Sequence, residues 1–151
     1  MFKTIKIQTT LNDHYKIAAQ IRDHHVIIDQ PKEAGGTNTG PTPLEYFLFS
    51  IAGCVLSIAR IVATQKKITL RGMSVNIEGD IDVARLLGKP TDSRAGFQEI
   101  RMNATLDADL TLDEKKEFLK EVEERCPVAE NIKEATTVEL VVVEQKRKTL
   151  S

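Results

Sequence analysis

Alternation of apolar and polar residues predicts a β-meander in the first part of the chain. It occurs in three short segments, Phe2–Thr9, Tyr15–Ile21 and His25–Ile28. Side chains on a strand point alternately to its two faces, so a period of two is typical of a half-buried strand. Leu11-Asn12-Asp13 supplies turn chemistry between the first two segments. We therefore expect short strands joined by tight turns.

A long apolar helix is predicted after a loop that runs from Pro31 to Pro43. Thr42 can act as its N-cap, Pro43 suits the first helical position, and Glu45 completes a capping box. Apolar residues then recur at helical spacing: Leu44, Phe47, Leu48, Ile51, Val55, Ile58 and Val62. Lys66-Lys67 marks the end of the helix, because cations are favourable near a helix C-terminus. Because little polar face remains, we expect this helix to be buried on most sides, in the core or against a partner.

The rest of the chain mixes strands and helices. Strands are expected at Leu70–Ile81, Phe97–Leu106 and Thr137–Val143, a helix after Thr111, and a short helical turn over Pro127–Glu134. Neither an internal repeat nor a linker interrupts the sequence. The layout predicts one α+β domain over residues 1–151.

Composition narrows the classes of partner. The chain has 151 residues, 21 Lys+Arg against 22 Asp+Glu, and 41% hydrophobic residues. This near-neutral balance argues against nucleic-acid binding, which needs a clustered basic surface. Neither a signal peptide nor an apolar stretch long enough to span a membrane is recognised. We expect a cytoplasmic protein with neither nucleic acid nor membrane as partner.

The potential metal ligands are too scattered for a metal site. The two cysteines, Cys54 and Cys126, stand 72 positions apart, and the three histidines all fall within the first 25 residues. Zinc sites need paired ligands at short spacing. We therefore expect neither a metal nor another cofactor.

Each cysteine can be interpreted either as an inert packing residue or as a reactive thiol. Cys54 lies within the apolar helix, where an unpaired cysteine packs as a small hydrophobe and burial raises its pKa. Cys126 precedes Pro127 and so stands at a helix N-terminus, where backbone N–H groups and Arg125 favour the thiolate; alternatively, it is a small residue at a kink. On these grounds alone Cys126 is the more reactive. Together, the two thiols could form a disulfide if their Cα atoms came within about 7 Å.

Other candidates have plain explanations. The segment from Gly35 to Gly40 lacks the spacing of a phosphate-binding loop, so its glycines are better explained by left-handed turn positions. Glu45 could be a catalytic carboxylate, although helix capping explains it. Arg22 could be a catalytic cation or a strand-end charge.

Four segments of the sequence form a recognisable pattern when they are taken together. They are residues 35–46 (GGTNTGPTPLEY) running on to Ser50-Ile51-Ala52-Gly53-Cys54, then Gly79–Asp82, Gly96–Ile100, and Arg125-Cys126-Pro127-Val128 with Asn131. Together they resemble the OsmC/Ohr family of organic hydroperoxide resistance proteins, in its OsmC-like subgroup. The resemblance spans nearly the whole chain. It implies an intertwined α+β homodimer, in which a curved antiparallel sheet wraps around a central apolar helix.

The resemblance also implies a reaction and its residues. It assigns Cys54 the attack on an organic hydroperoxide and Cys126 the resolving role, with a dithiol reductant restoring the pair. Hydroperoxide reductases of this family activate the thiol with an Arg–Glu pair, for which Arg22 and Glu45 are the candidates. Here Leu44 occupies the usual position of that glutamate, and Glu45 lies one helical step, about 100°, further on. Tyr46 and Phe47 are candidates to line the substrate approach.

Two alternatives to a peroxidase remain open. One is a module on the same fold that binds small molecules or carries thiols without turning over peroxide. The other is a structural domain with inert cysteines. The pKa of Cys54 separates the first from the peroxidase, because the thiolate is the nucleophile.

Overall fold

The computed structural model describes residues 1–143, apart from the side chains of Asn12 and Asp13. Its elements in chain order are β1 (Thr9–Asp13), β2 (Lys16–Ile21), β3 (His24–Ile28), the 3-10 turn η1 (Lys32–Ala34), α1 (Pro43–Lys66), β4 (Leu70–Asp80), β5 (Glu99–Ala108), α2 (Leu112–Glu124) and α3 (Pro127–Lys133). The strands β1-β2-β3 form one antiparallel sheet, and β4-β5 form another. The α+β prediction is confirmed.

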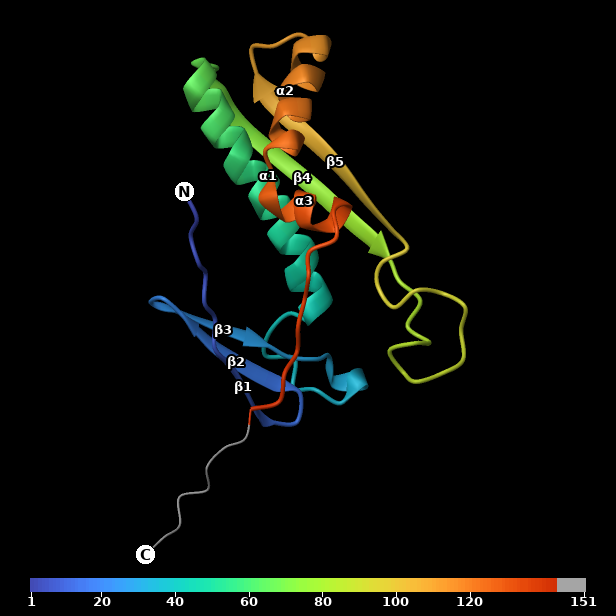
Figure 1. Ribbon diagram of the computed structural model, residues 1–151. Helices are drawn as coiled ribbons and strands as arrows, with labels where there is room; N and C mark the ends of the chain where they lie inside the picture. Colours follow the sequence, from blue (N-terminus) through green and yellow to red (C-terminus); the bar gives the residue numbers. More distant parts are fainter. Residues whose placement is uncertain (144–151) are drawn as a thin grey trace, which may run out of the picture.

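Helix α1 is the centre of the packed core. It lies along β4, while α2 and α3 pack against it and the three-stranded sheet sits near its first turn (Figure 1). Its buried residues are Ile51, Ala52, Val55, Ala59, Val62 and Ala63. Phe118 and Val122 from α2, with Leu106 from β5, complete the same cluster. Burying a side chain of this size stabilises the fold by about 1.5–3 kcal/mol.

The predicted start and end of α1 are confirmed. The N–H of Thr42 donates to Glu45 Oε2 over 2.7 Å, and the Thr42 hydroxyl accepts from the N–H of Glu45 over 3.3 Å. Pro43 takes the first helical position. At the other end, Lys67 adopts a left-handed conformation with φ of 55° and stops the helix.

By length and composition, α1 could also cross a membrane, contrary to the sequence prediction that no stretch could. A core helix of a water-soluble protein passes the same test. Here the side chains of Ala59 and Val62 are completely buried among β4, β5, α2 and α3. We interpret α1 as a core helix on that ground.

Three sequence predictions near the chain ends are wrong. The first strand spans Thr9–Asp13 instead of Phe2–Thr9, and the turn that follows it lies at His14 and Tyr15. Residues 137–143 form no strand. Both misplaced segments carry exposed apolar side chains, such as Phe2, Ile5, Leu140 and Val142. A segment with this alternation forms a strand only when it pairs with the edge of a sheet. Within residues 1–143 neither segment has such an edge to pair with.

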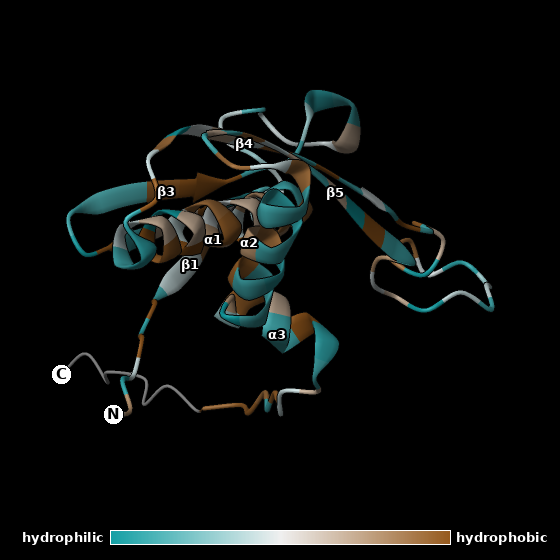
Figure 2. Ribbon diagram, turned by 90° about the horizontal axis from the view of Figure 1, so that it is seen from above, coloured by the Kyte–Doolittle hydropathy of each residue, from teal (hydrophilic) through white to brown (hydrophobic). Residues whose placement is uncertain are grey.

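The expected single curved sheet is divided in two. The sheet β1-β2-β3 lies near the start of α1, whereas the β4-β5 ribbon runs along its side (Figure 1). Figure 2 shows that much of the α1 ribbon is apolar, and part of that surface is uncovered: Phe49 is 71% exposed. A single chain therefore leaves a hydrophobic face of α1 open.

The loop before α1 is organised around a buried carboxylate. Asp29 is completely buried at the end of β3. It accepts hydrogen bonds from the hydroxyls of Thr37 and Thr39 over 2.5 and 2.9 Å, and from the N–H of Thr39 over 3.0 Å. The N–H of Gln30 donates to it as well, over 2.8 Å. The Thr37 hydroxyl is the first cause that holds the pKa of Asp29 far below its usual range.

Two glycines let this loop close on β3. A Cβ on Gly36 would lie 2.0 Å from the carbonyl oxygen of Gln30, and one on Gly40 would lie 2.4 Å from that of Ile27. Neither position can accept a side chain without moving the backbone. Tyr46 then fixes α1 to the same strand, because its hydroxyl donates to the carbonyl of Ile27 over 3.1 Å.

We expect Asp29 to make the fold acid-sensitive. A carboxyl with a depressed pKa in the folded state stabilises the fold above its unfolded pKa, about 3.9, and loses that effect as the pH falls further. Asp29→Asn should lower the thermal midpoint at pH 7 by several degrees and flatten its fall below pH about 4. Thermal unfolding midpoints of wild type and Asp29→Asn, recorded at several pH values between 3 and 7, measure both effects.

The matched control is Asp92→Asn, which removes an exposed carboxylate from the loop after β4. An Asp29→Asn profile that ran parallel to the wild-type profile at every pH would contradict this role.

Candidate functional site

The structure brings Cys54 and Cys126 together. Cys54 lies in the middle of α1 and is partly buried, whereas Cys126 is the N-cap of α3 and is completely buried. Their side chains share a hydrogen bond, and the N–H of Val128 donates to the sulfur of Cys54. Both sulfurs are free thiols. The packing of α3 on α1 therefore closes the 72-residue separation in sequence.

The local chain geometry explains the position of Cys126. Its N–H donates to the carbonyl of Glu123 over 3.2 Å, and its own carbonyl accepts from the N–H of Glu130 over 3.0 Å. Its φ and ψ of −84° and 105° are extended, so it separates α2 from α3. Pro127 then begins α3, as the sequence predicts.

The first turn of α3 serves Cys54 rather than Cys126. The N–H of Val128, which is unpaired within the helix at this position, points at the Cys54 sulfur. Cys54 is also the more accessible of the two thiols. Both observations favour Cys54 as the thiol that a substrate can reach, whereas the sequence alone ranks Cys126 as the more reactive.

Groups around Cys54 shift the pKa of its thiol in opposite directions. Burial is the main cause that raises the pKa of its thiol, and the hydrogen bond with Cys126 raises it further. The Val128 N–H acts in the opposite direction, because it stabilises the thiolate. Within residues 1–143 no cation contributes to this balance.

Glu45 is engaged elsewhere. At about 100° and 1.5 Å per residue, nine residues place it on the opposite side of α1 from Cys54, about 13 Å away along the axis. Its carboxylate caps the helix, and hydrogen bonds from Thr42 hold its pKa below the usual value. A single chain therefore does not bring Glu45 to the thiols.

Arg22 is also apart from the thiols. It lies in the turn between β2 and β3, with φ of 53°, and its side chain is exposed. Its carbonyl accepts from Gln20 Nε2 over 2.6 Å. In the described chain its guanidinium contacts neither Cys54 nor Glu45.

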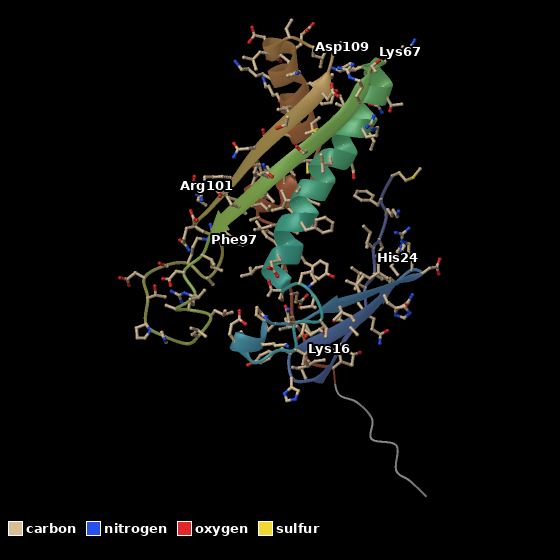
Figure 3. All side chains as sticks on the ribbon, turned by 180° about the vertical axis from the view of Figure 1, so that it is seen from behind. Lys16, His24, Lys67, Phe97, Arg101 and Asp109 are labelled. Carbon is tan, nitrogen blue, oxygen red and sulfur yellow. The ribbon has the colours of Figure 1, made fainter. Side chains whose placement is uncertain are left out.

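Some residues around the site have no clear signal in the sequence. Phe47 stacks on Phe97, with ring centroids 6.0 Å apart, and Figure 3 shows Phe97 at the end of β4 beside α1. Gly79 permits this contact, since a Cβ there would lie 2.6 Å from the Phe97 ring. Phe47 was expected near the approach and Phe97 was not. Tyr46, the other expected residue, is occupied with β3.

The described residues hold no cluster of three or more His, Cys, Asp or Glu side chains that could bind a metal ion. The site itself holds two adjacent thiols and the N–H of Val128 at the start of α3. Such a pair can be oxidised to a disulfide and reduced again.

Known proteins resemble this chain over most of its length. Residues 36–141 match the family model of OsmC-like proteins. A hydroperoxide reductase of Mycoplasma genitalium is 33% identical over 128 residues, which are 84% of this chain and 85% of that protein. A hydroperoxide reductase of Mycoplasma pneumoniae is 30% identical over the same share of both chains.

Solved structures agree. The crystal structure of an OsmC-like protein from Mycoplasma pneumoniae matches with a TM-score of 0.77 at 28% identity, over 89% of this chain and 91% of that one. An organic hydroperoxide resistance protein from Legionella pneumophila shares the fold, with a TM-score of 0.65 at 20% identity over 87% and 90% of the two chains. With its α+β fold and its matching sequence, the chain belongs to the OsmC-like protein family.

Proposed function

We propose that this protein is a thiol-dependent peroxidase that reduces organic hydroperoxides, with Cys54 as the attacking thiol and Cys126 as the resolving one. The observation that carries the proposal is the direct hydrogen bond between an accessible and a buried thiol. The hydroperoxide reductases that resemble the chain support the same reaction class.

The oxidative half of the reaction balances with the two thiols alone. The Cys54 thiolate attacks the outer peroxide oxygen of ROOH, the O–O bond breaks, and the alkoxide takes a proton to leave as ROH. Cys54 is then a sulfenic acid. The Cys126 sulfur attacks it, a disulfide forms, and water leaves. A dithiol reductant returns both thiols and is itself oxidised to a disulfide.

A second copy of the chain belongs to this proposal. Exposed apolar residues on α1 and in residues 138–143, among them Phe49, Leu140 and Val142, supply a surface that a partner chain would cover. Cys54 also needs a cation to offset its burial, and a partner chain could bring one, such as Arg22, to the thiol. We propose a homodimer in the cytoplasm, where a reducing environment keeps the pair ready.

One observation favours the alternative of a binding or thiol-carrier module. In the single chain, burial and Cys126 raise the pKa of Cys54, which lowers its thiolate fraction at neutral pH. The pH dependence of Cys54 alkylation in the assembled protein separates the two. Half-maximal reactivity well below pH 7 supports the peroxidase, and a value of about 8.5 or above supports the carrier.

Substituting each cysteine should block a different step. Cys54→Ser should lower peroxide turnover by at least about a hundredfold, because the nucleophile is gone. Cys126→Ala should still consume one equivalent of cumene hydroperoxide, but should stop at a sulfenic acid that a sulfenic-acid-specific reagent labels. Intact mass and free-thiol titration follow both.

Wild-type protein treated with cumene hydroperoxide is the control. Its intact mass should fall by two hydrogens and both free thiols should disappear, as expected for a disulfide within one chain. Turnover that persisted in Cys54→Ser would contradict the assignment of the attacking thiol.

Disrupting the exposed C-terminal segment should dissociate the dimer. Val142 is 96% exposed in the single chain, so Val142→Asp adds a charge to a surface that we expect a partner to bury. Light scattering should move from twice the chain mass of 16.9 kDa towards that mass. Glu139→Gln, in the same exposed segment, should remain dimeric. A monomeric wild-type protein would refute the homodimer.

A further inference from the structure

The thiols of Cys54 and Cys126 supply two sulfurs that are already in contact. Their side chains share a hydrogen bond, and they come from two different elements, the middle of α1 and the N-cap of α3. Cys54 is partly accessible and Cys126 is completely buried. The chain has no other cysteine. The pair is therefore a two-sulfur donor set that a ligand reaches from the Cys54 side.

The backbone holds Cys126 in place before any ligand binds. Its N–H donates to the carbonyl of Glu123 over 3.2 Å, and its carbonyl accepts from the N–H of Glu130 over 3.0 Å. The ammonium of Lys133 pairs with the carboxylate of Glu123 over 2.5 Å, which ties the end of α3 back to α2. A ligand that bonds to Cys54 thus finds the second sulfur already positioned, and little ordering entropy opposes the second bond.

Two sulfurs without further donors suit few ligands that favour thiols. In the part of the chain that the structure describes, no third His, Cys, Asp or Glu side chain joins the pair. Zinc takes four ligands in structural sites, so two sulfurs serve it poorly. Inorganic arsenite forms three arsenic–sulfur bonds and would be left one bond short. A monosubstituted trivalent arsenical, RAs(OH)₂, brings its own carbon as the third ligand and needs only two sulfurs.

The charge and shape of the site favour the same ligand. Ile58 lies one helical turn beyond Cys54 on the same face of α1, and Ile58 and Val128 pack against the core. Copper(I) with two thiolates would leave a net negative charge in these apolar surroundings, which is unfavourable. The dithiolate of a monosubstituted arsenical is neutral. Its sulfurs bond to arsenic at close to a right angle, so they remain near one another, as the two thiols are here.

We propose that the Cys54–Cys126 pair is a binding site for monosubstituted trivalent arsenicals, which it chelates through both sulfurs. RAs(OH)₂ condenses first with the accessible Cys54 thiol and then with Cys126. Two arsenic–sulfur bonds replace two arsenic–oxygen bonds, and two water molecules leave with the thiol protons. Arsenic stays trivalent and neither sulfur is oxidised, so the step needs no oxidant or reductant. This ligand class goes beyond the proposed function and does not depend on peroxide turnover.

The test treats the reduced full-length protein with one equivalent of phenylarsine oxide. The intact mass of a single chain should rise by one phenylarsenic group less two hydrogens, and both free thiols should disappear. Because the chelate has two arsenic–sulfur bonds, an excess of the monothiol glutathione should leave it in place, whereas the dithiol dimercaprol should remove it. Inorganic arsenite and Zn²⁺ should protect the thiols from alkylation only at concentrations at least about tenfold higher.

Variants separate chelation from attachment to one sulfur. Cys126→Ala and Cys54→Ser each keep a single thiol, so glutathione should strip the arsenical from both. Ser57→Ala removes a hydroxyl from the same helix, keeps both thiols, and should behave as wild type.

Three results with the wild-type protein would overturn the proposal, whether or not the variants fold. They are the absence of an adduct, an adduct that glutathione removes, and an adduct that joins two chains. Failure of the proposed function is a separate result, because these measurements involve no peroxide. A protein that reduced no hydroperoxide but held phenylarsenic against glutathione would keep this site.

Discussion

The structure depends on burying one helix that is apolar on nearly every side. A helix of this kind cannot be covered by a single sheet, so α1 receives β4 and β5 on one side and α2 and α3 on another. Even this leaves Phe49 and Ile61 exposed. The requirement to cover α1 therefore explains both the order of the elements and the hydrophobic surface that remains.

The thiol pair is a product of the same packing. Cys54 is one of the positions on α1 that the short helix α3 covers, and Cys126 is the N-cap residue directly before α3. The contact that fills the core is thus also the contact between the two sulfurs. Its cost is desolvation, which works against the thiolate at Cys54, and the Val128 N–H offsets that cost only in part. A single chain positions the pair without activating it.

The sequence predicts best where local chemistry decides. Thr42, Pro43 and Glu45 define the start of α1 through contacts three residues apart, and the alternation of β4 and β5 fits strands that pair with each other in the same chain. Prediction fails where the deciding contact is distant. Residues 137–143 have the pattern of a strand but no edge to pair with, and the buried role of Asp29 depends on Thr37 and Thr39, eight and ten residues later in an irregular loop.

The same distinction between local and distant contacts applies to the residues of the candidate site. The resemblance to a family singled out both cysteines, and packing brings them together. Arg22 and Glu45 could not be placed from the sequence, because their distances from Cys54 depend on the sheet β1-β2-β3 and on one helical step. Phe97 lies in the Gly96–Ile100 segment of the family pattern, but only the closure of the loop after β4 brings its ring against Phe47.

The uncovered strand-like segment at residues 138–143 has a consequence for biosynthesis. Ribosomes make proteins from the N-terminus, so this segment emerges after the core of α1, β4, β5 and α2 is complete. Its valines and leucine are β-prone and exposed, a composition that favours pairing with any open strand edge. Newly made chains at high local concentration thus face a choice between ordered pairing and aggregation, and expression rate becomes a determinant of soluble yield.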